Sequence, residues 1–183
     1  GNVAISTDTG VGDVDLSNGV AEGNFSLSVD VDGGSVILGD IGQTNPISSL
    51  TVSTTAGVTL EGDISTVNDV DFTSASGGTV LDANINITTS VTGDILFQNS
   101  NVSGTQKLTL TSGKNISLTG VGGEGTELIG LEIASGVDVD LYGSIYTDGG
   151  LDFSNVTGDV NINSNLSLET DSDNGIVDFT GVV

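Results

Sequence analysis

The sequence has no cysteine, histidine, methionine or tryptophan, and a single proline among 183 residues. Without cysteine the chain has neither disulfides nor thiolate metal ligands. Histidine and cysteine are the residues most often used as general base and as nucleophile, so we expect no enzyme activity. No apolar run reaches the roughly 18 residues of a membrane-spanning helix, and we expect no membrane insertion.

Positive charge is almost absent too. Lys107 and Lys114 stand against 25 acidic residues, which gives a formal net charge of −23. Nucleic-acid binding needs clustered Lys and Arg to displace counterions, so this class of partner is excluded. An anionic membrane surface would repel the chain. High net charge also keeps an exposed protein soluble.

Hydrophobic residues nevertheless make up 36% of the chain, a share that disfavours disorder. Most of them are Val, Ile and Leu, and the β-branched members favour strands. They occur as pairs separated by one residue, a spacing that puts both members on one face of a strand. Gly, Asn, Asp and Ser separate the pairs, as turns do. Examples are Val36/Leu38, Leu50/Val52, Val58/Leu60, Ile95/Phe97 and Val139/Leu141.

The sequence also repeats internally. Residues 50–95 align with residues 131–176 at a constant shift of 81, which matches Leu50 with Leu131. Upstream the shift is 80, pairing Gly42 with Gly122, so one residue is gained in the loop between them. We interpret residues 1–183 as one segment with repeats of approximately 35–114 and 115–183 and a partial copy over 1–34.

Two all-β architectures fit many short strands, a sandwich of hairpins and a solenoid of stacked coils. The long repeat favours the solenoid, as does the scarcity of hairpin turn signals. We therefore predict a right-handed parallel β-helix (β-solenoid). With about 20 residues and ~4.8 Å per coil, it would have about nine coils and be roughly 43 Å long. Both ends read as ordinary strand, so we expect them to join flanking repeats or another copy.

A family resemblance follows from two runs, Gly57-Val58-Thr59-Leu60-Glu61-Gly62-Asp63-Ile64 and Gly113-Lys114-Asn115-Ile116-Ser117-Leu118-Thr119-Gly120. They resemble repeats of filamentous-haemagglutinin-type adhesins, autotransporter passengers and other giant surface proteins. The resemblance implies a secreted, extracellular β-helix that projects a binding region from the cell surface. It also implies host-surface or matrix glycans as partners.

Acidic pairs at a spacing of two suggest calcium, which favours clustered oxygen ligands. The best candidates lie in turn-like sequence, Asp30 with Asp32 and Asp171 with Asp173. The alternative is that such Asp residues face water while the valine between them faces the core, as with Val14, Val70 and Val139.

Six Asn-x-Ser/Thr triplets are candidate glycosylation sites. They begin at Asn24, Asn86, Asn101, Asn115, Asn155 and Asn165. A chain rich in Asn, Ser and Thr also produces such triplets by chance.

Three functional hypotheses remain open. The first is a non-catalytic structural rod or stalk of a secreted cell-surface adhesin. The second is a filament or surface-layer subunit that self-assembles through open solenoid ends. The third is a carbohydrate-active β-helix, since inverting glycosidases need only carboxylates.

Overall fold

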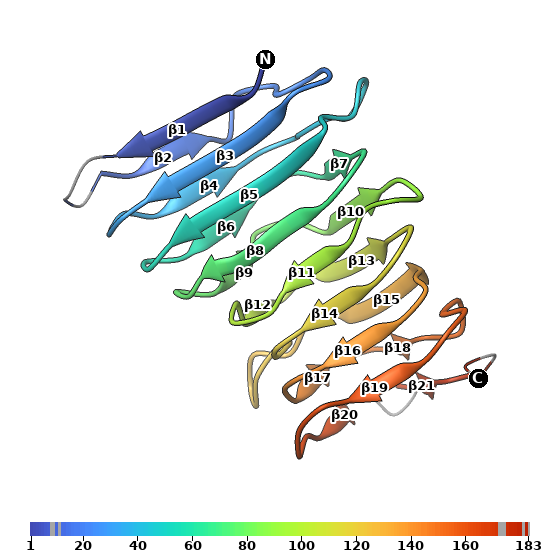
Figure 1. Ribbon diagram of the computed structural model, residues 1–183. Helices are drawn as coiled ribbons and strands as arrows, with labels where there is room; N and C mark the ends of the chain where they lie inside the picture. The colour runs from blue at the N-terminus through green and yellow to red at the C-terminus, as the bar shows by residue number, and fades with distance from the viewer. Residues whose placement is uncertain (8–9, 11, 172–174, 181, 183) are drawn as a thin grey trace.

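The computed structural model describes residues 1–7, 10, 12–171, 175–180 and 182. Within these residues every regular element is a β-strand, and all strand pairs are parallel. The chain forms a β-solenoid (Figure 1), which confirms the predicted fold class. This part of the chain contains no helix long and apolar enough to cross a membrane.

Three faces run along the solenoid. Sheet A is eight-stranded and contains β1 (Val3–Thr7), β3 (Ser26–Val31), β5 (Ser49–Thr54), β8 (Val70–Ala75), β11 (Ile95–Phe97), β14 (Ile116–Leu118), β16 (Val139–Leu141) and β19 (Val160–Ile162). Sheet C is six-stranded and contains β7 (Ile64–Thr66), β10 (Ile85–Thr89), β13 (Lys107–Thr111), β15 (Gly130–Ser135), β18 (Leu151–Asp152) and β21 (Val177–Asp178).

Sheet B lies between them in chain order. Its first part contains β2 (Val14–Leu16), β4 (Val36–Leu38), β6 (Val58–Leu60), β9 (Thr79–Leu81) and β12 (Val102–Gly104), and its second part contains β17 (Ile145–Thr147) and β20 (Leu168–Thr170). Val121 connects the two parts, because it bridges both Val102 and Ile145. In Figure 1 the chain runs along sheet A in front and returns behind it while descending, which is a right-handed winding.

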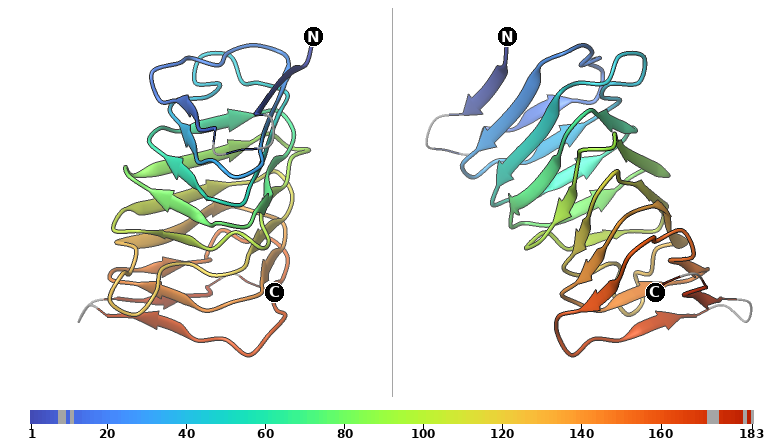
Figure 2. Two further views of the ribbon diagram at one scale, coloured as in Figure 1. Left: turned by 90° about the vertical axis from the view of Figure 1, so that its left-hand side faces the viewer. Right: turned by 45° about the vertical axis from the view of Figure 1, so that its right-hand side comes forward.

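The solenoid has about seven turns, so the sequence-based estimate of about nine was too high. Leu50 pairs with Val70, 20 residues later, whereas Val70 pairs with Ile95, 25 residues later. Most turns are longer than the assumed 20 residues because their corners carry loops of different lengths. At ~4.8 Å per turn the solenoid is about 34 Å long. Figure 2 shows the stacked turns from two further sides.

The core consists of inward-facing columns of aliphatic side chains, one from each turn. Leu50, Val70 and Ile95 form part of one such column, and each is completely buried. Leu60 and Leu141 are also fully buried, as the predicted in-register stacking requires. Burial of the aliphatic columns is the main favourable term for each turn, which has too little apolar surface to fold alone. Among the columns, the rings of Phe72 and Phe97 stack with centroids 4.9 Å apart.

The 81-residue repeat does not coincide with a whole number of turns. Leu50 lies in sheet A, whereas its sequence match Leu131 lies in sheet C. Val58 of sheet B likewise matches Val139 of sheet A. The repeat therefore spans three and two-thirds turns. This offset is possible because all three faces use the same local pattern, two inward-facing residues separated by one outward-facing residue.

Candidate functional site

Several acidic side chains at the corners are hydrogen-bonded to the next turn. Directly before the sheet A strands lies a corner column, which we define as Asp69, Asp94, Asn115, Asp138 and Asp159. Asp69 Oδ1 accepts the backbone N–H of Asp94 at 2.9 Å, and Asp94 Oδ1 accepts that of Asn115 at 2.9 Å. Asp138 Oδ1 accepts the N–H of Asp159 at 3.0 Å. These carboxylates tie successive turns together.

The other two corners use the same contact. Before sheet B, Asp13 Oδ1 accepts the backbone N–H of Ser35 at 2.7 Å and its hydroxyl at 2.8 Å. These two bonds hold the pKa of Asp13 below its ordinary value. Before sheet C, Asp63 accepts the N–H of Asn86 at 2.8 Å. The sequence reasoning missed this role, although an Asp, Asn or Ser directly before many of the apolar pairs was a visible signal.

The acceptor role of the corner carboxylates can be tested at Asp94. Asp94 is partly buried, and alanine at this position would leave the N–H of Asn115 without its acceptor. We expect Asp94→Ala to be about 1 kcal/mol less stable than Asp94→Asn, which removes the same charge but keeps an acceptor oxygen. Urea unfolding of both variants measures the difference. Equal stabilities would show that the carboxylate does not act as a structural acceptor.

The three predicted calcium ligands that the structure describes do not belong to the corner column. Asp30 is exposed on β3, Asp32 is exposed just after it, and Asp171 is exposed after β20. Asp173 lies outside the described residues. Within the described part of the chain, no three His, Cys, Asp or Glu residues are grouped so that they could hold a metal ion. Calcium binding remains a hypothesis for these positions.

The alternative interpretation was that the paired Asp residues face water while the valine between them faces the core. The burial of these valines agrees with it. Val14, Val70 and Val139 face the core and are at most 8% exposed. The flanking Asp residues are exposed or partly buried on the outside of the solenoid. The two members of each such pair also differ in partner. Asp69 bonds to the next turn, whereas Asp71 accepts the N–H of Thr73 within its own strand at 2.8 Å.

The six candidate glycosylation triplets share one feature: the middle residue is apolar and is buried or partly buried. Asn101 and Asn115 directly precede strands, whereas Asn86 lies inside β10. The other three Asn residues lie in turns or bends. Five of the Asn residues are exposed, and Asn115 is partly buried. The Asn86 amide nitrogen, the atom that would carry a glycan, donates to Asp63 at 2.9 Å. Glycosylation remains a prediction.

Two loops interrupt the regular corners and project from the body (Figure 1). One is residues 42–46, and the other is residues 122–127, one residue longer, as the change of repeat shift predicted. Each begins with a glycine at positive φ, 71° at Gly42 and 66° at Gly122. A Cβ at either glycine would lie within 2.3 Å of a carbonyl oxygen of the next turn. These loops expose backbone and polar side chains that a partner could contact.

Glu22 anchors the first loop. Its carboxylate accepts the backbone N–H of Thr44 at 3.0 Å and that of Asn45 at 2.5 Å. These bonds, with Thr44 the larger contributor, lower the pKa of Glu22 from its ordinary value. Because the pKa is lowered by folding, the carboxylate holds the loop above the unfolded pKa of about 4.3 and releases it as the pH falls through the folded pKa.

This linkage predicts a local, pH-dependent opening. Hydrogen-exchange protection of the Thr44 and Asn45 amides should be high at neutral pH and should fall as the pH drops through the lowered, folded-state pKa of Glu22, after correction for intrinsic exchange. Glu22→Gln should show lower protection at neutral pH and no such acid-dependent loss. Protection that does not change with pH in the wild type would contradict the anchoring role.

The two lysines differ in their contacts. Lys107 forms an ion pair with Glu132 of the next turn, as expected for a cation among acidic coils. A shallow hollow of about 220 Å³ lies beside this pair, and Ile129, Gly150 and Asp152 line it as well. Lys114 is exposed. The hollow places one ammonium and two carboxylates on the outer surface of sheet C.

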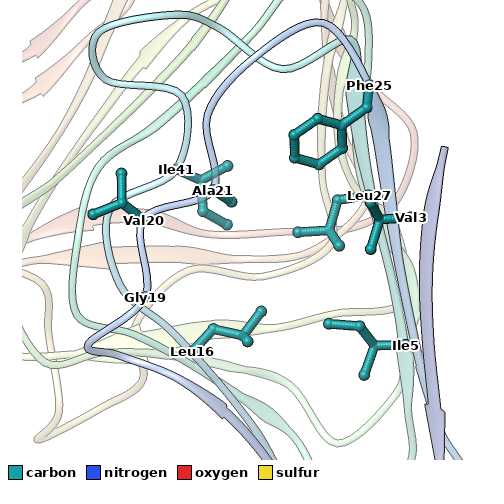
Figure 3. A pocket seen from close by; sticks show the side chains of 9 residues that line it. All are labelled: Val3, Ile5, Leu16, Gly19, Val20, Ala21, Phe25, Leu27 and Ile41. Carbon is teal, nitrogen blue, oxygen red and sulfur yellow. The ribbon is translucent and has the colours of Figure 1, made fainter. Parts of the chain in front are cut away.

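A second hollow, of about 160 Å³, opens at the N-terminal end of the solenoid (Figure 3). Its lining is aliphatic and aromatic, with Leu16, Ala21, Phe25, Leu27 and Ile41 among the residues. The hollow therefore lies over the core of the first turn and not on one of the outer faces.

Comparison with protein-family models, curated proteins and solved structures gave no match for this chain.

Proposed function

We propose that the chain is a non-catalytic structural rod or stalk of a secreted cell-surface adhesin, of the filamentous-haemagglutinin or autotransporter-passenger type. The observation that carries the proposal is the continuous core, in which the sheet A column from Leu27 to Val139 has a buried aliphatic side chain in every turn. In such a stack each turn is stabilised by its two neighbours, so the structure extends along one axis. A rod of this kind suits a spacer that holds another region away from a surface.

The outer surface supports the same role. The formal charge of −23 is distributed over the corners and outer faces, where it keeps a long exposed protein soluble. Polar contacts between turns, such as those of the corner column, tie the coils together without using core space. The absence of His and Cys from the sequence favours a non-catalytic role.

Binding of host-surface or matrix glycans belongs to this proposal. The loops 42–46 and 122–127 carry the most protruding polar groups, including the exposed Gln43, Thr44 and Asn45. Amide and hydroxyl groups of this kind can donate and accept hydrogen bonds with sugar hydroxyls. We propose these loops as the contact because they project from the body of the solenoid (Figure 1).

An antibody raised against the purified chain tests the location. Intact cells of the source organism should stain as strongly as lysed cells, whereas an antibody to a cytoplasmic protein should stain only after lysis. Staining confined to lysed cells would refute a surface role.

For the adhesive part of the proposal, beads coated with the chain are applied to a glycan array. Binding should be lost when both loops are replaced by Gly-Ser segments of equal length.

A further inference from the structure

The hollow of about 220 Å³ on the outer side of sheet C has features of a binding site. We propose that it binds an arginine side chain of a partner protein. Residues of three successive turns line the hollow, from β13, β15 and β18 and from the positions directly before β15 and β18. The proposal depends on three features of this lining, which are its open floor, its unbalanced charges and its single exposed apolar side chain.

Two glycines leave the floor of the hollow open. Lys107 pairs with Gly130 of the next turn. Leu131 pairs with Leu151, which puts Gly150 opposite Gly130. Side chains alternate between the two sides of a strand, and Leu131 and Leu151 are buried, so the lysine and the two glycines stand at outward positions. A long side chain in one turn is therefore followed by two turns that have no side chain at this position.

The fold does not require glycine at these two positions. Neither Gly130 nor Gly150 has a positive φ. A Cβ would lie 3.3 Å from the nearest atom of another turn at Gly130 and 3.8 Å from it at Gly150, whereas the distance at Gly143 is 1.6 Å. A side chain at Gly150 would meet only an ordinary contact, and one at Gly130 would need a small shift. The missing side chains thus leave the space that the hollow occupies.

The charged side chains beside this floor do not balance. Glu132 pairs with Asp152 of the next turn, so two carboxylates stand directly opposite each other on strands ~4.8 Å apart. Lys107 forms an ion pair with Glu132, and Asp152 Oδ1 accepts the backbone N–H of Ser154 at 2.8 Å. One ammonium thus faces two carboxylates. Like charges directly opposite each other destabilise a sheet, so a cation bound between Glu132 and Asp152 would relieve this repulsion.

A guanidinium group fits this arrangement better than a metal ion does. Calcium takes six to eight oxygen ligands, and the part of the chain that the structure describes has no group of three acidic side chains that could hold a metal. A guanidinium is planar and presents five N–H donors, so it can bond to Glu132 and Asp152 at the same time. Such charge-assisted bonds are stronger than bonds between neutral groups.

The size and the apolar part of the lining indicate a single side chain. The hollow is smaller than the roughly 300–1,000 Å³ of sites for drug-sized ligands. Ile129 lines it as well and is 53% exposed. The aliphatic stem of an arginine can pack on Ile129 while its guanidinium reaches the carboxylates. The formal net charge of −23 attracts a basic protein surface, from which such an arginine would project.

A titration followed by nuclear magnetic resonance tests the proposal on the 183-residue chain. The probe is a short capped peptide with one arginine between two glycines. The matched peptide has citrulline in place of arginine, which keeps the shape and removes the charge. At low salt the arginine peptide should shift the amide signals of Gly130 and Gly150 with a dissociation constant in the millimolar range, because a partly exposed ion pair is weak. The citrulline peptide should leave both signals unchanged.

Three variants separate the hollow from general attraction between opposite charges. Gly150→Val fills the floor without changing the net charge and should abolish the shift at Gly130. Asp152→Asn removes one carboxylate but keeps an acceptor for the N–H of Ser154, and should weaken binding about fivefold or more. Asp82→Asn is the matched control, because it removes an exposed carboxylate outside the hollow. It should bind as the wild type does. Thermal unfolding checks that each variant is folded.

Lys107→Met distinguishes a cationic ligand from a sugar. Removing this ammonium frees Glu132 and should strengthen binding of the arginine peptide about fivefold, the size of the repulsion between two charges ~4 Å apart in water. A sugar that used Lys107 as a hydrogen-bond donor would instead bind this variant more weakly.

Four results would overturn the proposal. They are a wild type whose Gly130 and Gly150 signals do not respond to the arginine peptide, unchanged binding in Gly150→Val, weaker binding in Lys107→Met, and equal losses in Asp152→Asn and Asp82→Asn. The inference does not depend on adhesion, because glycan binding is assigned to the loops 42–46 and 122–127 and is tested by replacing them.

Discussion

Replacing Phe97 with alanine is expected to lower the free energy of unfolding by about 3–5 kcal/mol. Phe97 is completely buried in a central turn, and its ring stacks on that of Phe72. Alanine would leave a cavity that the aliphatic columns on either side cannot fill, because each of their residues is held in place by hydrogen-bonded strands above and below. Equilibrium unfolding in guanidinium chloride measures the loss.

The control for this variant is Val91→Ala. Val91 is 83% exposed, so we expect its truncation to change stability by less than about 0.5 kcal/mol. The unfolding curve of Phe97→Ala carries further information. In a solenoid the stability is close to a sum of turn and neighbour terms, so a weakened central turn can uncouple the two halves. A broader or two-step transition would then accompany the loss. A loss below about 1 kcal/mol would contradict the packing of this column.

The second large effect is expected at a glycine corner. A Cβ on Gly143 would lie only 1.6 Å from the carbonyl oxygen of Thr119 in the preceding turn. Turns are stacked ~4.8 Å apart, and backbone that approaches closely across this spacing leaves no room for a side chain. Gly143→Ala must therefore displace one turn relative to the other. We expect a loss of about 1–3 kcal/mol, measured by thermal and urea unfolding.

Gly150→Ala is the matched comparison for this corner. The nearest atom to a Cβ there is 3.8 Å away, an ordinary contact distance. Alanine at a compatible glycine position restricts the unfolded chain and stabilises the protein by about 0.4–1 kcal/mol. The two substitutions should thus have opposite signs. If both variants are destabilised equally, the effect comes from the loss of glycine itself and not from the close approach of two turns.

The glycine at position 143 and the acidic residues at the corners both serve the close stacking of adjacent turns. The glycine lets adjacent turns come close, and corner carboxylates such as that of Asp94 accept the backbone N–H groups of the next turn. A highly acidic chain can be stable in this fold because the corner carboxylates are used as hydrogen-bond acceptors on the outside, while the core remains apolar.

The local pattern of the sequence determined the fold class. Alternating pairs such as Val58/Leu60 place their side chains on one face, and the intervening Gly, Asn and Asp turn the chain, so parallel stacking follows once hairpin signals are scarce. The gained residue in the loop 122–127 could also be read from the repeat shift.

Other features were decided only by the tertiary structure. The number of turns depends on the lengths of the corner loops. The sum of those lengths also decides that Leu131 lies three and two-thirds turns after Leu50, and so on a different face. Asp63 could not be assigned as an acceptor for Asn86, 23 residues away, before the register was known. The hollow beside Ala21 likewise requires three strands that are distant in sequence. Side-chain periodicity depends on residues that are neighbours in sequence, so it could be read directly. Register depends on the packing between turns. The partners of each contact come from different turns, so they could be identified only from the tertiary structure.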